Sequence, residues 1–190
     1  MGLDINSLKD FFPFGSAMLG AMTGGLITYN ITKAKEKKEK HQKRVESIFE
    51  LQAKLSEMLN ETIDFKMETL LLGGNDSKNS QGSEQLHFLK KLKTYFHEKI
   101  IRNREILCSL AIHIDKNVFV RVGKAYNEIF DIFGKTNKEN FQGDIHKDFE
   151  AYLELVVCTM NEIILKINHL IRYLLKKEHE HVKYFLEKYI

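Results

Sequence analysis

Hydrophobic residues recur with a helical period along most of the chain. From residue 45 onward, apolar side chains return every three or four positions, which is the spacing of one face of an α-helix. No segment shows the apolar/polar alternation of a half-buried strand, and the single proline is Pro13. The pattern predicts a long first helix ending near Leu72, followed by helices over about 84–116, 118–133 and 145–190. The chain is therefore expected to be all-α.

The apolar positions also predict which residues form the core. Segments 73–83 and 134–144 are rich in Gly, Asn, Asp and Ser, so they are expected to be loops, with Asp144 as the N-cap of the last helix. Short loops between amphipathic helices favour an antiparallel bundle of four or five helices. In the first helix the expected core positions are Val45, Ile48, Phe49, Leu55, Met58, Leu59, Ile63 and Met67. In the last helix they are Ile145, Phe149, Leu153, Val156, Met160, Ile164, Ile167, Ile171, Leu174, Val182 and Phe185.

The stretch from Phe11 to Thr32 contains 22 residues and no charge. A helix needs roughly 20 apolar residues to cross the hydrocarbon layer, so this length predicts an N-terminal transmembrane helix. Its small residues form two stripes at i+4 spacing, a pattern that lets membrane helices pack closely. The stripes predict an oligomer built by spans of several copies. The first stripe contains Ser16, Gly20, Gly24 and Thr28, and the second contains Ala17, Ala21 and Gly25.

The apolarity of this stretch is diluted by four glycines and by Ser, Thr and Asn. A glycine-rich helix inside a soluble bundle is the alternative interpretation. Gly costs roughly 1 kcal/mol relative to Ala in a soluble helix, which disfavours that alternative. A cleaved signal peptide is also disfavoured, because the preceding segment "MGLDINSLKD" has one Lys against two Asp.

A basic segment over 33–44 follows directly. It holds seven Lys or Arg and two Glu, a net charge of +5, and it is called the basic collar below. Such a collar is expected to contact anionic lipid headgroups and to stay on the cytoplasmic side of a membrane. The basic residues are Lys33, Lys35, Lys37, Lys38, Lys40, Lys43 and Arg44.

This division predicts three parts: an N-terminal segment with a transmembrane helix over 1–32, the basic collar, and a cytoplasmic helical bundle over 45–190. The expected location is a bacterial inner membrane, single-pass, with the N-terminus outside and the bundle in the cytoplasm. The chain has a net charge of +3. Residues 1–32 carry −1 and the collar +5, which leaves −1 for the bundle, so a dedicated nucleic-acid binder is disfavoured and no DNA partner is expected. Cys108 and Cys158 lie in apolar helical contexts typical of buried free thiols.

Few motifs carry chemistry. There is no glycine-rich phosphate loop, zinc-type Cys pair, HExxH or nucleophile elbow, so no cofactor or metal is expected. Asn168, Arg172 and His179 fall on one stripe of the last helix, which Asn161 continues. A His that acts as acid or base and an Arg that stabilises phosphorane charge are the groups of metal-independent RNA cleavage. The same stripe is also where polar residues at the edge of a buried face are expected.

The spacing Arg172-x6-His179 on the last helix resembles the R-x4-6-H signature of HEPN domains. A single N-terminal span joined to such a domain is similar to the small membrane-anchored HEPN-like accessory proteins of type VI-B CRISPR systems. The resemblance implies a homo-oligomer whose spans surround a pore that opens when a partner RNA-guided nuclease detects foreign transcripts. It also implies that Arg172 and His179, supported by Asn168, are a catalytic, regulatory or structural pair.

The sequence therefore favours a membrane-anchored accessory effector of RNA-guided antiviral defence that forms an oligomeric pore and permeabilises or depolarises the inner membrane. Its expected partners are membrane lipid, other copies of the chain, and an RNA-guided nuclease or RNA as activator. One alternative is a membrane-tethered, metal-independent HEPN ribonuclease in which Arg172 and His179 of two protomers meet. A phage-type lysis protein and a plain membrane-anchored adaptor are the others.

Overall fold

The computed structural model describes residues 5–74, 82–136 and 148–190, and the side chains of the first helix from Thr23 onward. These residues are helical almost throughout and contain no strand, so the predicted all-α bundle is confirmed. The elements are α1 (Ile5–Gly74), α2 (Gly82–Tyr95), the π-helical segment η2 (Phe96–Ile101), α3 (Arg102–Ile114), α4 (Lys116–Gly134) and α5 (Phe149–Tyr189).

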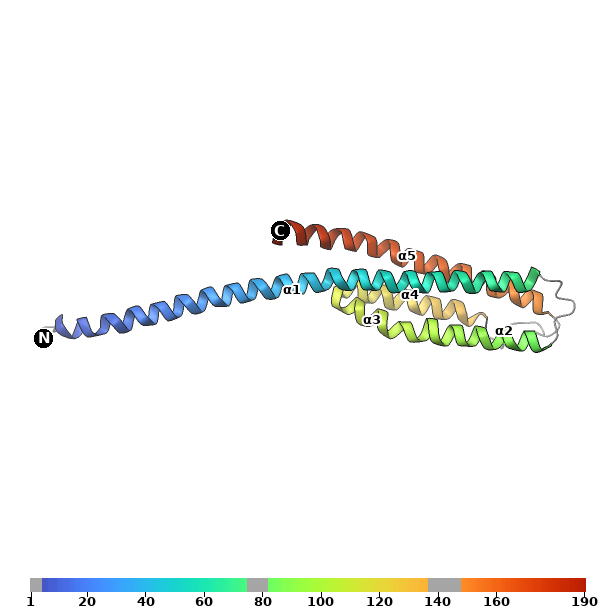
Figure 1. Cartoon of the computed structure of the whole chain (residues 1–190), viewed down its shortest axis with the longest axis horizontal. Coiled ribbons are helices and arrows are strands. Elements are labelled where there is room, and N and C mark those ends of the chain that lie inside the picture. Colours follow the sequence, from blue (N-terminus) through green and yellow to red (C-terminus); the bar gives the residue numbers. More distant parts are fainter. Residues whose placement is uncertain (1–4, 75–81, 137–147) are drawn as a thin grey trace.

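Two long helices, α1 and α5, organise the molecule. The C-terminal half of α1 packs mainly against α5 and α3, while α4 packs between α3 and α5 (Figure 1). The N-terminal half of α1 projects well beyond the bundle, and the C-terminal end of α5 lies near the middle of α1 (Figure 1). The bundle is thus a head at one end of a 70-residue helix.

One continuous core joins these helices. It includes Leu55 and Met58 of α1, Leu107 of α3, Tyr126 of α4 and Ile163 of α5, all of them at most 1% exposed. The apolar face predicted for the last helix is largely confirmed, since six of its described positions are buried: Phe149, Leu153, Val156, Met160, Ile167 and Leu174. The other four, Ile164, Ile171, Val182 and Phe185, are half-buried. Hydrophobic burial on this scale, at roughly 25 cal/mol per Å² of apolar surface, is what holds the helices together.

The predicted helix over 84–116 is three consecutive elements. The buried residues follow one another at three or four positions until Tyr95, and the next one is Ile100, five positions on. The π-helical segment η2 absorbs the additional residue, so the same side of the chain stays buried on both sides of it. Within η2, Phe96 stacks on Phe133 of α4 with 3.8 Å between ring centroids.

The predicted transmembrane helix is corrected by the structure. Among the residues described, no helix contains a stretch that is both long and apolar enough to cross a membrane. In the part of the predicted span whose side chains are described, Gly24, Gly25 and the Thr and Asn residues between Thr23 and Thr32 lower the mean hydropathy despite Leu26, Ile27 and Ile31. Residues 11–22 of the predicted span precede the described side chains. Of the expected fold class, the all-helical bundle is retained and the transmembrane helix is not.

Several predicted core positions are exposed instead. Phe49, Ile63 and Met67 of α1 are 48%, 38% and 51% exposed. Thr62 and Thr69 occupy the buried face of α1 in place of Ile63 and Met67. The predicted N-cap Asp144 and the core position Ile145 lie outside the described residues.

Candidate functional site

The predicted Arg172 and His179 lie on the outer side of α5. Both side chains are exposed, and Asn168 is half-buried on the same side. Seven positions separate Arg172 from His179, about 10 Å along the helix axis. Within the parts of the chain that the structure describes, neither side chain has a hydrogen bond or an ion pair. One chain therefore presents both residues to solvent without joining them into an acid–base pair.

The predicted stripes of small residues fall on the projecting part of α1. Ser16, Ala17, Gly20 and Ala21 precede the described side chains, whereas Gly24, Gly25 and Thr28 are exposed. A Cβ atom added at Gly24 or Gly25 meets nothing within 4 Å. These glycines therefore have room for a side chain within one chain, and packing inside the monomer does not explain them.

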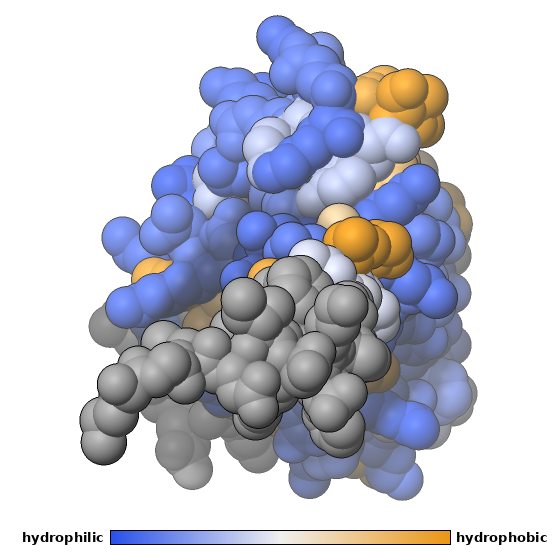
Figure 2. Space-filling view, turned by 90° about the vertical axis from the view of Figure 1, so that its left-hand side faces the viewer, coloured by the Kyte–Doolittle hydropathy of each residue, from blue (hydrophilic) through white to orange (hydrophobic). Residues whose placement is uncertain are grey.

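The basic collar divides into two parts. All its lysines are exposed: Lys33, Lys35, Lys37, Lys38, Lys40 and Lys43. The end of the molecule from which α1 projects is predominantly hydrophilic (Figure 2).

Arg44 is different, because it is half-buried and its Nε atom is shielded from solvent without a hydrogen-bond partner in the described structure. Together with Lys40 and Lys43 it lines an open pocket of about 530 Å³ against residues 112–116, where Glu36 and Glu39 also lie. The tertiary structure thus places the end of the collar against the α3–α4 junction.

The α3–α4 junction is centred on Asp115, which sequence reasoning did not single out. Its carboxylate caps α4, with Oδ1 accepting a hydrogen bond of 2.8 Å from the backbone N–H of Val118. The other oxygen, Oδ2, lies 3.8 Å from Nε2 of His181 on α5. The N-cap rule applied to the segment "HIDKNV" would have found the cap, but only the fold brings His181 to it.

His181 and the nearby His41 each have a lowered pKa. Burial is the main cause of the lowered pKa of His181; the Asp115 carboxylate acts in the opposite direction, and the positive charges of Arg44 and Lys177 lower it further. Burial followed by the charge of Arg44 lowers the pKa of His41, whose ring lies 4.8 Å from that of Tyr184. Protonation of either histidine therefore opposes folding.

This direction predicts a pH-dependent stability. A histidine with a lowered pKa in the folded state binds its proton more readily when the chain is unfolded, so the free energy of unfolding falls as the pH drops below about 6.5. We expect His181→Gln to reduce the slope of stability against pH between about 7 and 5. Urea unfolding at several pH values measures this slope. His179→Gln, on the exposed side of the same helix, is the matched control, and equal slopes in the two variants would contradict the assignment.

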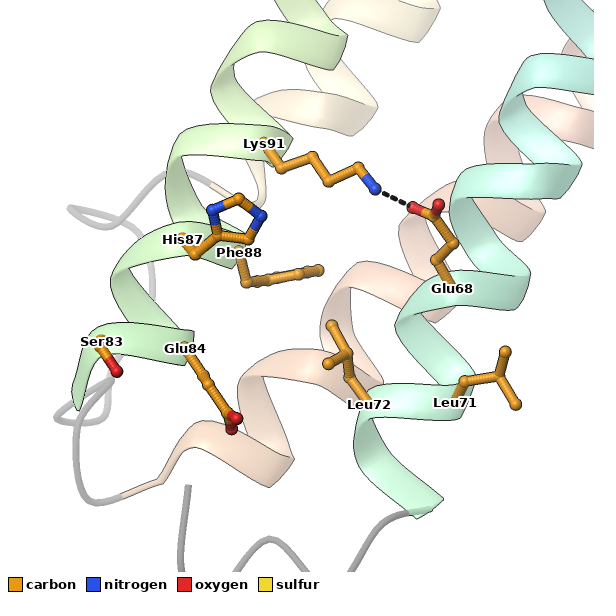
Figure 3. Close-up of a pocket in the computed structure, with 8 residues that line it drawn as sticks. All are labelled: Glu68, Leu71, Leu72, Ser83, Glu84, His87, Phe88 and Lys91. Carbon is orange, nitrogen blue, oxygen red and sulfur yellow. Dashed lines mark ion pairs between the residues drawn. The ribbon is translucent and has the colours of Figure 1, made fainter. Parts of the chain in front are cut away.

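A second pocket lies at the opposite end of the bundle, between α1 and α2. It has a volume of about 450 Å³, and the Leu72 and Phe88 side chains form its apolar part (Figure 3). Lys91 Nζ and Glu68 form an ion pair of 2.6 Å at its edge, and His87 and Glu84 lie on the α2 side (Figure 3). The size suits a small molecule, but the lining contains no paired catalytic groups.

Neither a metal-binding cluster nor a similar known protein assigns a function to these sites. Among the described residues, no group of three or more His, Cys, Asp or Glu is arranged to hold a metal ion. Comparisons with protein-family models, curated proteins and solved structures each return no match. The HEPN-like resemblance and the catalytic role of Arg172 and His179 therefore stay predictions.

Proposed function

We propose that the protein is a self-assembling helical scaffold, in which the projecting part of α1 joins several copies and the bundle is the head that each copy presents. The observation that carries this proposal is the exposure of α1 before the bundle. Every residue from Thr23 to Lys40 is exposed, including Leu26, Ile27 and Ile31, which are 60–64% exposed.

An exposed helix of this kind is expected to pack against a helix of another molecule. Helical stability in proteins comes mainly from packing, and a helix without tertiary contacts is marginal in water. Gly24 and Gly25 weaken this helix further by about 1 kcal/mol each relative to Ala. A helix from another molecule that packs along the glycines would supply the missing contacts, because small residues let two helix backbones approach closely.

We choose another copy of the chain as this partner, because no second kind of molecule is then needed. Identical helices packed around a symmetry axis offer each other the same surface, as in most homo-oligomers. A pore is not part of this proposal, because it required the membrane-spanning helix that the structure corrects. An accessory role in RNA-guided antiviral defence, and contact of the basic collar with lipid headgroups, stay predictions.

The test is the mass of the purified full-length protein by light scattering. We expect a discrete oligomer for the natural sequence and a smaller species for the double variant Gly24→Leu/Gly25→Leu. Both leucines have room in the monomer and favour the helix, but they block close approach of a second helix.

Gly123→Leu is the matched control, since a Cβ at this α4 position also meets nothing within 4 Å. It should leave the mass unchanged. A monomeric natural protein, or an oligomer unaffected by the double variant, would overturn the proposal.

A further inference from the structure

The outer side of α5 has opposite charges at its two ends. Glu150 and Glu154 are exposed near its N-terminal end, whereas Arg172, Lys176 and Lys183 are exposed in its C-terminal half. Within the described chain, Glu154, Arg172 and Lys176 have no ion pair, and Lys183 has one at 3.8 Å to Glu187. Among the described residues, Glu154 at one end of this side and Arg172 and Lys176 at the other are therefore opposite charges without an ion pair.

An exposed leucine lies between the two groups of charges. Leu165 is 58% exposed, and it is eleven positions from both Glu154 and Lys176. Cys158 and Asn161, which lie between Glu154 and Leu165, are small and uncharged as well as exposed. Near the centre, Glu162 is exposed but forms an ion pair of 2.9 Å with Lys135 of the same chain. The charge at the centre is thus balanced within the bundle, and the two ends of the surface are complementary to each other.

We propose that a second copy of the chain docks on this surface, with the two α5 helices antiparallel and the two-fold axis at Leu165. In this arrangement Glu154 of each copy faces Lys176 of the other, and the two Leu165 side chains meet. A parallel arrangement in the same register would oppose Glu154 to Glu154 and Lys176 to Lys176, so the charges select the antiparallel one. The contact between residues 154 and 176 is about 33 Å long.

This register places the two Arg172 residues apart. Each lies seven positions from the axis, so the two are separated by about 21 Å along the helices. The antiparallel contact therefore does not form a shared site from Arg172 and His179 of two protomers. It is also independent of α1, so it adds a second interface to the assembly proposed above, and it can be present whether or not that assembly forms.

Cysteine crosslinking in the full-length protein tests the register. The background is Cys158→Ser, in which half-buried Cys108 is the remaining thiol. We expect Leu165→Cys in this background to give a covalent dimer with a short bis-maleimide. Leu186→Cys is the matched control, because it is 50% exposed on the same helix but lies 21 positions from the axis. Absence of the Leu165→Cys dimer, or equal crosslinking in both variants, would overturn the proposal.

A charge exchange tests the partner surface. Glu154→Lys should weaken dimerisation about five- to tenfold, because two ion pairs per dimer become repulsive contacts. Adding Lys176→Glu should restore it, and dimerisation of the natural protein should weaken as salt is raised. Failure of the second substitution to restore crosslinking would exclude the predicted pairing.

The same crosslinking in the Gly24→Leu/Gly25→Leu variant separates the two proposals. Loss of the large oligomer with the Leu165→Cys crosslink retained supports two independent interfaces. Loss of the crosslink together with the oligomer would overturn the α5 interface as a separate contact. If the protein that keeps Gly24 and Gly25 forms the oligomer but gives no Leu165→Cys crosslink, the α5 interface is overturned and assembly through α1 stands alone.

Discussion

Replacing Leu107 by Ala is expected to lower the free energy of unfolding by about 2–5 kcal/mol. Leu107 is fully buried on α3, a helix that packs against both α1 and α4. The substitution removes the transfer free energy of the deleted methyl and methylene groups and leaves a cavity that the surrounding helices fill only in part. Urea unfolding followed by circular dichroism measures the loss as a lower midpoint at an unchanged slope.

The neighbouring Ile106 is the control for this prediction. It is 42% exposed on the same helix, so Ile106→Ala removes a side chain of equal size without opening a cavity of similar volume. A change within about 0.5 kcal/mol is usual for surface positions. Equal losses in the two variants would show that α3 does not face the core in the way described.

The second large effect is expected at the buried hydrogen bonds between α1 and α2. Thr62 Oγ1 donates its single proton to the carbonyl of Met58 at 2.6 Å, and it lies 2.7 Å from the Tyr95 hydroxyl. Tyr95 must therefore be the donor in the second bond. Burial raises the pKa of Tyr95 to about 12, so this hydroxyl keeps its proton at neutral pH.

Removing the acceptor is expected to cost more than removing the donor. Thr62→Val leaves the buried Tyr95 hydroxyl without a partner and should destabilise the protein by about 1–3 kcal/mol. Tyr95→Phe leaves Thr62 bonded to Met58 and should cost about 1 kcal/mol or less. Combining the two should recover part of the loss of Thr62→Val, which a double-mutant cycle of unfolding free energies measures.

Thr69→Val is the matched control for this cycle. Thr69 is also fully buried on α1, but among the described residues its hydroxyl bonds only to the carbonyl of Phe65, at 2.8 Å. That carbonyl also accepts a hydrogen bond within the helix. No donor is orphaned by this change, so the expected loss is smaller than for Thr62→Val. A greater loss at Thr69 would contradict the account given for Tyr95.

The candidate sites show which residues a sequence pattern can group together. The exposed stripe of Arg172 and His179 was visible in the sequence because helical spacing alone determines which residues of α5 share a side. Asp115, His181 and Arg44 belong to three different helical regions, and no spacing relates them. Their meeting depends on how α1, α4 and α5 pack, and so do the lowered pKa values of the two histidines.

The sequence by itself determined that the chain is helical and which side of α5 is buried, because the 3.6-residue period of Phe149, Val156, Ile167 and Leu174 is a local property. On α1 the predicted core positions Ile48, Leu55 and Met58 are buried, but only the tertiary structure decided the buried side after Met58. Thr62 and Thr69 replace Ile63 and Met67 there, since a threonine that donates to the carbonyl four residues earlier can be buried at little cost. It also decided the π-helical segment between Tyr95 and Ile100, where packing against α1 and α4 overrides the regular period.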